Sequence, residues 1–463
     1  MQGEEVWDCV PFGNGGNWCR GFDDVWGPCL THPFAAPPAA RKVVSPRVER
    51  EKEIGAITKC CKQLGTIDFE SNLPVVIVNT SGKEIPDEPK TVASMCTCGS
   101  EGSDYDGTVG IEIRGSTSAR DFSKKSYAVE TRKNETGGSE NVKLLGLPKD
   151  NDWVFYGPEA DATMGFRNLI AFTLGRSMGR YASRYKYFEL FLVDDGEALS
   201  MEHYQGLYVL AEQVKRGKDR VNISKRKDDD LSGGYIFKYD NDNNDPGDTL
   251  FTTKLSTLQM ILVYPKPGDS KKEEVDAIKG YLDEFEAALT SKKFKSRKSG
   301  YKNHIDMGSF IDYFLLSEIT KNPDSYRGSA FIHKDAGGPL AMGPIWDYNE
   351  AFGVCCGFPI EGFLKHGHST GRSGGSAISP EGWRFNICVD QHRCKVDPLD
   401  GTSLWYRRLW QDPAFRRAAQ KRWTELRAAA FSDEAVRNLI EETKLRIKKP
   451  ALRNYAKTEN FAF

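Results

Sequence analysis

The stretch from Asp324 to Gly353 reads DSYRGSAFIHKDAGGPLAMGPIWDYNEAFG. Two acidic residues, Asp324 and Asp347, stand before and after its apolar part. The strand-like segment SAFIHK, the turn residues DAGG and the strand-like segment PLAMGPIW together predict a β-hairpin. Because a hairpin brings its two outer ends to one end of a rigid element, we expect the two carboxylates to lie close together.

Length and composition limit the possible classes of protein. The chain has 463 residues, which is enough for two or three domains, and its 39% hydrophobic and 28% charged residues are typical of a soluble globular protein. The formal net charge of −1 provides no global attraction to nucleic acid or to an anionic membrane. Apolar runs are too short for a membrane-spanning helix, and the first residues lack the basic and apolar regions of a signal peptide.

The eleven cysteines allow two readings. They form no CxxC pair, and the chain has only seven histidines, so a structural zinc site has weak support. Clusters at 9–29 and 355–394 lie in Gly-rich segments, which is typical of disulfides in an oxidising compartment. The alternative is a set of buried free thiols, and spacing does not decide between the two.

Three sections with different patterns follow one another along the chain. Residues 1–70 are rich in Cys, Pro and Gly and read as an N-terminal extension. Residues 71–245 contain many short segments of β-branched and aromatic residues, which predict a strand-rich lobe. Residues 246–463 read as mainly helical outside the hairpin. We therefore expect an α+β fold with a strand-rich lobe and a helical lobe, and a ligand site between them.

The order of elements around the hairpin suits phosphoryl transfer. A helix predicted over residues 306–322 leads the chain to Asp324, Ser329 follows five residues later, and Asn349 stands two residues after Asp347. One carboxylate can orient an attacking hydroxyl while the other holds Mg²⁺ on the phosphates. Acidic residues at hairpin ends are also common in proteins without such chemistry, so a structural role is the alternative.

A second polar segment lies in the strand-rich section. The segment IRGSTSARDFSKKSYAVE places Arg114, Ser116 and Ser118 in a turn, and Lys124 and Lys125 at the start of the next strand. Small turn residues can offer N–H groups and hydroxyls to a phosphate, and a lysine adds a point charge. Because strand residues alternate, only one of the two lysines can face a cleft. An ordinary hairpin with solvated lysines is the alternative reading.

Further polar segments carry weaker signals. Glu212 ends an apolar strand, where it can pair with a cleft lysine or remain an exposed strand-end charge. Residues 240–248 resemble a calcium loop, but Asp245 and Phe251 occupy the positions where an EF-hand needs Gly and Glu. The basic run at 291–302 is typical of a solvated face, and docking of an acidic substrate is its less favoured reading.

Taken in order, these segments resemble the CotH-type kinases, a family named for a spore-coat protein. The resemblance runs from about residue 75 to about residue 445. It depends on seven motifs in succession, which are IRGSTSARDFSKKSYAVE, LLGLPKDNDWVFYGPEADATMGFRNLIAFTLGRSMG, FELFLVDD, YQGLYVLAEQVKRGKDRV, GGYIFKYD, KNPDSYRGSAFIHKD and GPIWDYNEAFG. Seven ordered matches are far more specific than any one of them.

The resemblance implies an atypical kinase-like, two-lobed fold. It also implies transfer of the ATP γ-phosphate, with Mg²⁺ or Mn²⁺, to Ser/Thr of protein substrates, and a secreted or surface location. The implied site consists of a catalytic aspartate, a metal aspartate and a phosphate-binding group. These residues are Asp324 as the catalytic aspartate, Asp347 as the metal ligand, and Arg114, Ser116, Ser118, Lys124, Lys125 and Glu212 around the nucleotide.

Two residues depart from the family pattern. Ser329 stands where the family carries Asn, and Asn349 stands where it carries a second Asp. A serine hydroxyl is a shorter and poorer cation ligand than an amide carbonyl, and Asn349 removes a negative charge from a divalent-cation site. Both changes are expected to weaken metal binding without abolishing it. A weakly active or inactive surface or coat protein that acts as an interaction module is therefore the alternative function.

Overall fold

The computed structural model describes residues 9–12, 16–20, 26–28, 59–99, 104–115, 117–159, 161, 163–227, 229–240, 244–322, 324–326, 328–352, 354–355, 358–359, 383–386 and 401–457. The chain divides into two compact units, Met1–Ala56 and Ile57–Phe463. In the first unit, three antiparallel strands form a sheet in the order β1-β2-β3. These strands are β1 (Cys9–Phe12), β2 (Gly16–Arg20) and β3 (Trp26–Pro28).

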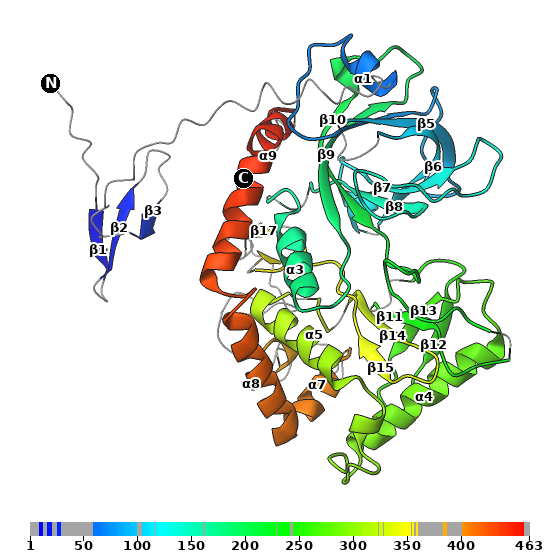
Figure 1. Ribbon diagram of the computed structural model, residues 1–463, viewed down its shortest axis with the longest axis vertical. Coiled ribbons are helices and arrows are strands. Elements are labelled where there is room, and N and C mark those ends of the chain that lie inside the picture. Colours follow the sequence, from blue (N-terminus) through cyan, green and yellow to red (C-terminus); the bar gives the residue numbers. More distant parts are fainter. Residues whose placement is uncertain are drawn as a thin grey trace, which may run out of the picture. The chain divides into compact units, whose positions relative to one another are not determined.

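A closed seven-stranded barrel forms the strand-rich part of the second unit (Figure 1). Neighbouring strands are antiparallel around the order β10-β8-β7-β6-β5-β4-β9, except for the parallel pair of β4 and β9. Trp153, Phe155 and Phe188 are fully buried in its core. The strands are β4 (Val75–Asn79), β5 (Thr91–Cys98), β6 (Asp106–Arg114), β7 (Ser126–Arg132), β8 (Asp152–Tyr156), β9 (Tyr185–Val193) and β10 (Tyr204–Glu212).

A second sheet contains the hairpin expected from the sequence. Its strand order is β12-β13-β11-β14-β15, and β14 pairs with β15 so that Ile332 faces Met342. The hairpin prediction is therefore confirmed. The sheet begins with β11, which lies before residue 245 and pairs with β13 and β14. The strands are β11 (Tyr235–Tyr239), β12 (Thr249–Thr252), β13 (Gln259–Tyr264), β14 (Ala330–Lys334) and β15 (Leu340–Met342).

Two of the described helices begin at an aspartate whose carboxylate caps them. The carboxylate of Asp306 accepts the Gly308 N–H at 3.0 Å, and that of Asp412 accepts the Ala414 N–H at 2.9 Å. Pro413 occupies the first turn of its helix, where no N–H is needed. The helices are α1 (Lys59–Leu64), α2 (Thr117–Asp121), α3 (Phe166–Ser177), α4 (Lys272–Thr290), α5 (Met307–Thr320), α7 (Ser403–Trp410), α8 (Pro413–Arg427) and α9 (Asp433–Lys457).

Shorter elements complete the described part of the chain. They are the paired strands β16 (Val354–Cys355) and β17 (Phe358–Pro359), and the 3₁₀ turns η2 (Met201–His203), η3 (Tyr301–Asn303) and η4 (Arg384–Asn386). The mixture of helices and strands confirms the expected α+β class, although the closure of the barrel was not expected. Within the described residues, no helix combines the length and apolar character needed to cross a membrane.

Two disulfides join α1 to β5. Cys60 pairs with Cys96 and Cys61 with Cys98, with Cα–Cα separations of 5.5 and 5.2 Å that are ordinary for disulfides. The cysteine side chains at 9–29 and 355–394 lie outside the described residues, so the pairing expected there stays a prediction. The two bonds crosslink a short helix that has little surface of its own to bury.

Helix α9 packs back against the barrel strand β10 (Figure 1). The fully buried carboxylate of Glu189 accepts hydrogen bonds from Arg453 of α9, at 2.9 Å from Nε and 2.5 Å from Nη2. The next residue of α9, Asn454, accepts a hydrogen bond at its Oδ1 from the Leu207 N–H at 3.0 Å. Gly206 permits this approach, because a Cβ there would lie 2.3 Å from Asn454 Oδ1. The C-terminal helix is thus fastened to the barrel by polar contacts.

We predict that Arg453→Met lowers the free energy of unfolding by about 3 kcal/mol, because the substitution leaves the buried Glu189 carboxylate with the Tyr204 hydroxyl but without its cationic partner. Denaturant unfolding followed by circular dichroism measures this change. Adding Glu189→Gln should restore part of the loss, since the uncompensated charge is then removed. Lys449→Met, an exposed position on the same helix, is the control. A loss no larger than that of the control would show that the α9 contact contributes little.

Candidate active site

The backbone at Asp347 is held in an uncommon conformation. Its φ angle is 61°, in the left-handed region that few residues other than glycine adopt. The Asp347 carbonyl accepts a hydrogen bond from Asn322 Nδ2 at 3.2 Å, and the next N–H, of Tyr348, donates to Asn168 Oδ1 at 2.6 Å. Both asparagines are buried. Strained positions of this kind persist where the surroundings fix them, and they cluster at functional sites.

Strand pairing places Asp240 in contact with Ser329. Strand β11 pairs with β14 so that Tyr239 faces Ala330, which places Asp240 opposite Ser329. One carboxylate oxygen of Asp240 accepts the Ser329 N–H at 2.8 Å and is 3.4 Å from the Ser329 hydroxyl, while the other oxygen is bonded by Lys238. Asp240 is buried, and Ser329 has a φ of 48°. In the sequence, Asp240 belongs to segment 240–248, whose spacing does not fit a calcium loop, so the pattern gave no sign of this contact.

Asp324 lies in the loop that follows α5, beside Asp240. Its N–H donates to Asn322 Oδ1 at 3.4 Å, and its carbonyl accepts the Gly328 N–H at 2.8 Å. A Cβ at Gly328 would be 3.6 Å from the Asp324 Cβ and 3.7 Å from an Asp240 carboxylate oxygen. The small residue at position 328 therefore separates two carboxylates that approach the same place from different elements.

The three aspartates influence one another electrostatically. The pKa of Asp347 is raised to about 7, mainly because surrounding protein removes hydration, and further because Asp324 and Asp240 are negatively charged neighbours. Arg114 and Lys238 oppose this shift. The Asp347 side chain nevertheless reaches solvent, so an incoming ligand has access to it. An acidic centre flanked by two cations is an arrangement suited to a cation and an anionic ligand together.

Arg114 is a cation of the barrel that faces this centre. It ends β6, and its guanidinium carbon lies 5.7 Å from the ring centroid of Trp346, next to Asp347. Burial lowers the pKa of Arg114, and the charge of Asp347 acts in the opposite direction. The structure therefore brings together Arg114, Asp324, Asp347 and Ser329 among the residues expected from the sequence.

The two lysines expected near the nucleotide are bonded to protein atoms instead. Lys124 Nζ donates to the Leu207 carbonyl at 2.7 Å and to Asn454 Oδ1 at 2.5 Å, and it lies 4.6 Å from the ring centroid of Tyr208. Burial lowers the pKa of Lys124 to about 7. Lys125 Nζ donates to backbone carbonyls of the turn that carries α2, at 2.7 and 2.6 Å. Neither ammonium contacts the acidic centre through these bonds.

The turn that precedes these lysines is compact. Gly115 has a φ of 100°, and a Cβ there would lie 2.2 Å from the Ser118 hydroxyl oxygen, so the hydroxyl folds back over the turn. Ser116 lies outside the described residues. A phosphate contact for Ser116 and Ser118 stays a prediction.

Glu212 is neither an exposed strand-end charge nor a partner of a lysine. It is fully buried, and its carboxylate accepts hydrogen bonds from Arg184 Nη1 at 2.6 Å and from the Arg184 N–H at 3.1 Å. The sequence interpretation of a lysine–glutamate pair at this position was therefore wrong. Strand β9 begins beside the end of β10, which brings Arg184 to Glu212.

The donors at the acidic centre are of the kind that hard cations prefer. Carboxylate, amide and hydroxyl oxygens come from the three aspartates, from Asn349 in the turn after Asp347, and from Ser329. Among the His, Cys, Asp and Glu side chains of the described residues, three potential ligand atoms lie within 4.8 Å of one another only in Cys61, Cys98 and Asp104, where the sulfurs are joined in a disulfide. The three aspartates are farther apart, so a bound cation would draw them inward.

Comparison with known proteins shows the family of the chain. A family model described as CotH kinase protein matches residues 111–462, a range that contains every residue of the candidate site. The match begins and ends later than the extent of about 75–445 expected from the motifs. No curated protein matches the chain in sequence. Because the family model covers well over half of the 463 residues, the chain belongs to the CotH kinase family.

Proposed function

We propose that the chain is a kinase that transfers the γ-phosphoryl group of ATP to Ser or Thr hydroxyls of proteins, its own included, with Mg²⁺ or Mn²⁺. The observation that supports this best is that Asp240, Asp324 and Asp347 converge on one place. Arg114 lies near Asp347, over the ring of Trp346. A two-lobed, kinase-like arrangement and a secreted or surface location are part of the proposal. The two disulfides favour such a location, because disulfides persist in oxidising compartments.

In this proposal each residue has a separate task. Asp347, with Asn349 and Ser329, would hold the divalent cation, which neutralises phosphate charge when bound. Arg114 would contact the phosphates, because its guanidinium already faces Asp347 and offers a planar set of donors. Asp324 would orient the attacking hydroxyl and accept its proton late in transfer.

Asp240 gives the proposal a feature that the motifs did not suggest. Its carboxylate contacts Ser329, the position where the family carries an amide. A negatively charged oxygen beside the serine hydroxyl partly replaces the ligand strength that the shorter side chain lacks. This contact supports a working cation site in spite of Ser329 and Asn349.

The alternative is a protein that binds the same ligands but transfers phosphate slowly or not at all. The two departures at Ser329 and Asn349 favour it, since both reduce the strength of the cation ligands. The two functions differ in turnover, not in ATP binding. A transfer assay with radiolabelled ATP, a protein acceptor and either Mg²⁺ or Mn²⁺ separates them.

Asp347→Asn is expected to abolish cation-dependent ATP binding while the protein stays folded. Binding is lost because the substitution removes the charged ligand of the cation. The fold is kept because the substitution also removes one of three carboxylates that repel one another. Calorimetric titration with ATP, with and without Mg²⁺ or Mn²⁺, measures the effect. Asp87→Asn, at an exposed position far from the centre in sequence, is the control. Unchanged cation-dependent affinity in Asp347→Asn would refute the assignment.

For Asp324→Asn we expect ATP affinity and melting temperature close to those of the unmodified protein, but transfer slower by roughly a hundredfold or more. The amide keeps the size of the side chain but cannot accept the hydroxyl proton. Single-turnover phosphate transfer and thermal unfolding are the two measurements. If Asp324 has only a structural role, stability falls and transfer declines in proportion. Full turnover in a well-folded variant would contradict the catalytic role.

Arg114→Gln should weaken ATP binding roughly 10- to 100-fold, because one charge-assisted contact to the phosphates is lost. Lys124→Met and Lys125→Met are the matched comparisons. Their ammonium groups are bonded to carbonyl and amide oxygens of the protein, so we expect them to affect stability more than affinity. A larger loss of ATP affinity in either lysine variant than in Arg114→Gln would assign the phosphate contact to that lysine instead.

A further inference from the structure

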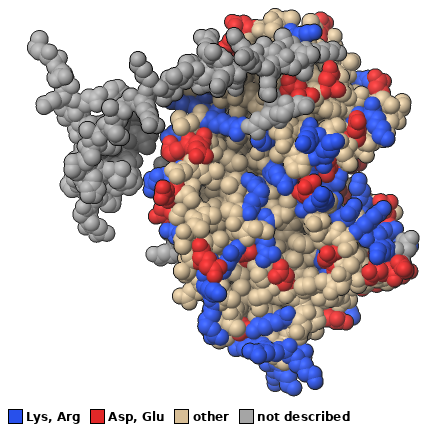
Figure 2. Space-filling model, in the orientation of Figure 1, with Lys and Arg blue, Asp and Glu red and all other residues tan. Residues whose placement is uncertain are grey.

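The loop between α4 and α5 carries a group of exposed cations. We call the residues Lys292, Lys293, Lys295, Arg297 and Lys298 the basic loop; all five are exposed. Within the described part of the chain, none of them forms an ion pair with an acidic side chain. Figure 2 shows Lys and Arg side chains gathered at the lower end of the molecule, where this loop lies in Figure 1.

The backbone of the basic loop is firmly held, so its five cations stay gathered on one surface. Phe294 and Tyr301 are buried and stack with ring centroids 6.2 Å apart. The guanidinium carbon of Arg408 lies 3.7 Å from the Phe294 ring centroid, and Arg408 donates to the carbonyls of Leu289 and Ser291, each at 3.0 Å. Like charges fixed in this way repel one another, and a bound anion would relieve the repulsion.

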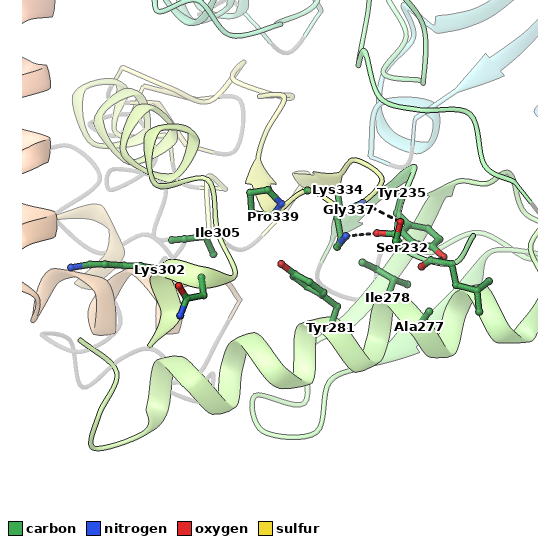
Figure 3. Close-up of a pocket in the computed structure, with 13 residues that line it drawn as sticks. Ser232, Tyr235, Ala277, Ile278, Tyr281, Lys302, Ile305, Lys334, Gly337 and Pro339 are labelled. Carbon is green, nitrogen blue, oxygen red and sulfur yellow. Dashed lines mark hydrogen bonds between the residues drawn. The ribbon is translucent and has the colours of Figure 1, made fainter. Parts of the chain in front are cut away.

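A cavity of about 410 Å³ begins where the basic loop ends (Figure 3). Lys302 and Asn303 line its edge, and Tyr281 and Ile278 of α4 line its floor together with Ile305. The ammonium of Lys334 in its wall is already bonded to the Ser232 carbonyl and lies 4.6 Å from the Tyr281 ring centroid. The lining also offers apolar and aromatic surface, and its volume leaves room for a bulky apolar or aromatic side chain together with neighbouring parts of a ligand.

The cavity is separate from the acidic centre, because its lining includes none of Asp240, Asp324 and Asp347. Its distance from the basic loop follows from helix geometry. Tyr281 and Lys292 are separated by about three turns, or roughly 15 Å, mostly along α4. An extended peptide rises by roughly 3.3 Å per residue, so about five residues span this distance.

We propose that the basic loop and the adjoining cavity bind an acidic peptide segment, with an apolar or aromatic side chain in the cavity and Asp or Glu side chains on the loop. The segment would belong to a protein substrate, which makes this inference rest on the proposed kinase function. The five exposed cations suit acidic side chains, and the adjoining cavity, with apolar and aromatic residues in its lining, suits an apolar or aromatic side chain of the same peptide. The net charge of −1 and the confinement of these cations to one loop also disfavour a polyanion or an anionic membrane.

Fluorescence anisotropy with a labelled peptide tests the proposal. The peptide carries a cluster of four Glu about five residues from a Trp; one comparison peptide has Ala for Trp, and another has Gln for Glu. The protein is used both unmodified and as Asp347→Asn, so that binding is measured independently of phosphate transfer. We expect saturable binding by both proteins that weakens as salt rises, and weaker binding of each comparison peptide.

Substitutions separate the two parts of the surface. Changing Lys292, Lys293 and Lys298 to Glu is expected to weaken binding about tenfold or more. The matched control changes the exposed Lys218, Lys448 and Lys449 to Glu, which alters net charge equally, and should bind within about twofold of the unmodified protein.

Ala277→Phe, which places a phenyl ring at the cavity lining and narrows it, should weaken binding of the Trp peptide but not of the Ala peptide. Ala287→Phe, at an exposed position of the same helix, is its control and should leave both unchanged.

Several results would overturn the proposal. Equal loss in the Lys218, Lys448 and Lys449 control would mean that net charge alone causes binding. Tighter binding of single-stranded DNA of equal charge, or of phosphatidylserine vesicles, would show the wrong class of partner. Peptide binding without any phosphate transfer would retain the docking surface and reject the kinase function. Phosphate transfer to proteins without peptide binding would retain the kinase function and reject the docking surface.

Discussion

The pairing of β11 with β14 is the constraint on which the candidate site depends. The register that sets Tyr239 opposite Ala330 also sets Asp240 beside Ser329, and the hairpin formed by β14 and β15 returns the chain to Asp347. One sheet thus positions carboxylates that repel one another, and the surrounding structure holds them together. Asn322 and Asn168 fix the strained backbone at Asp347 and its neighbour, while Arg114 and Lys238 offset part of the negative charge. A centre built in this way is poised to accept a cation.

The barrel contributes the other half of the arrangement. Strand β6 ends at Arg114, and closure of the barrel leaves that strand no free edge, so the guanidinium is aimed from a rigid element. Helix α9 then packs against β10, through Arg453 and Asn454. Asn454 Oδ1 also accepts a hydrogen bond from the Lys124 ammonium, which holds this lysine at α9 and away from the acidic centre. Contacts that fasten the fold therefore decide which cation faces the carboxylates.

Local patterns predicted the parts of this structure that depend on neighbouring residues. The hairpin, the helix that precedes Asp324 and the α+β class followed from turn residues and periodicity. The closed barrel and the role of Asp240 did not, because they depend on pairing between distant strands; Asp240 and Ser329 are 89 residues apart. The same reason applies to Glu212, whose partner Arg184 is brought to it by pairing of β9 with β10. The alternation of side chains along a strand showed that only one of Lys124 and Lys125 can face a cleft. It could not reveal that Asn454, on the distant helix α9, accepts a hydrogen bond from Lys124.

The central claim is that the aspartates beside the hairpin form the cation site of a nucleotide-binding centre. Crystals grown with Mn²⁺ and a non-hydrolysable ATP analogue test it most directly, because the anomalous scattering of Mn²⁺ locates the ion without assumptions. We predict an anomalous peak at bonding distance from a carboxylate oxygen of Asp347, with the triphosphate against Arg114. A peak elsewhere, or a triphosphate bound away from Arg114 with Asp347 free of the ion, would contradict the claim.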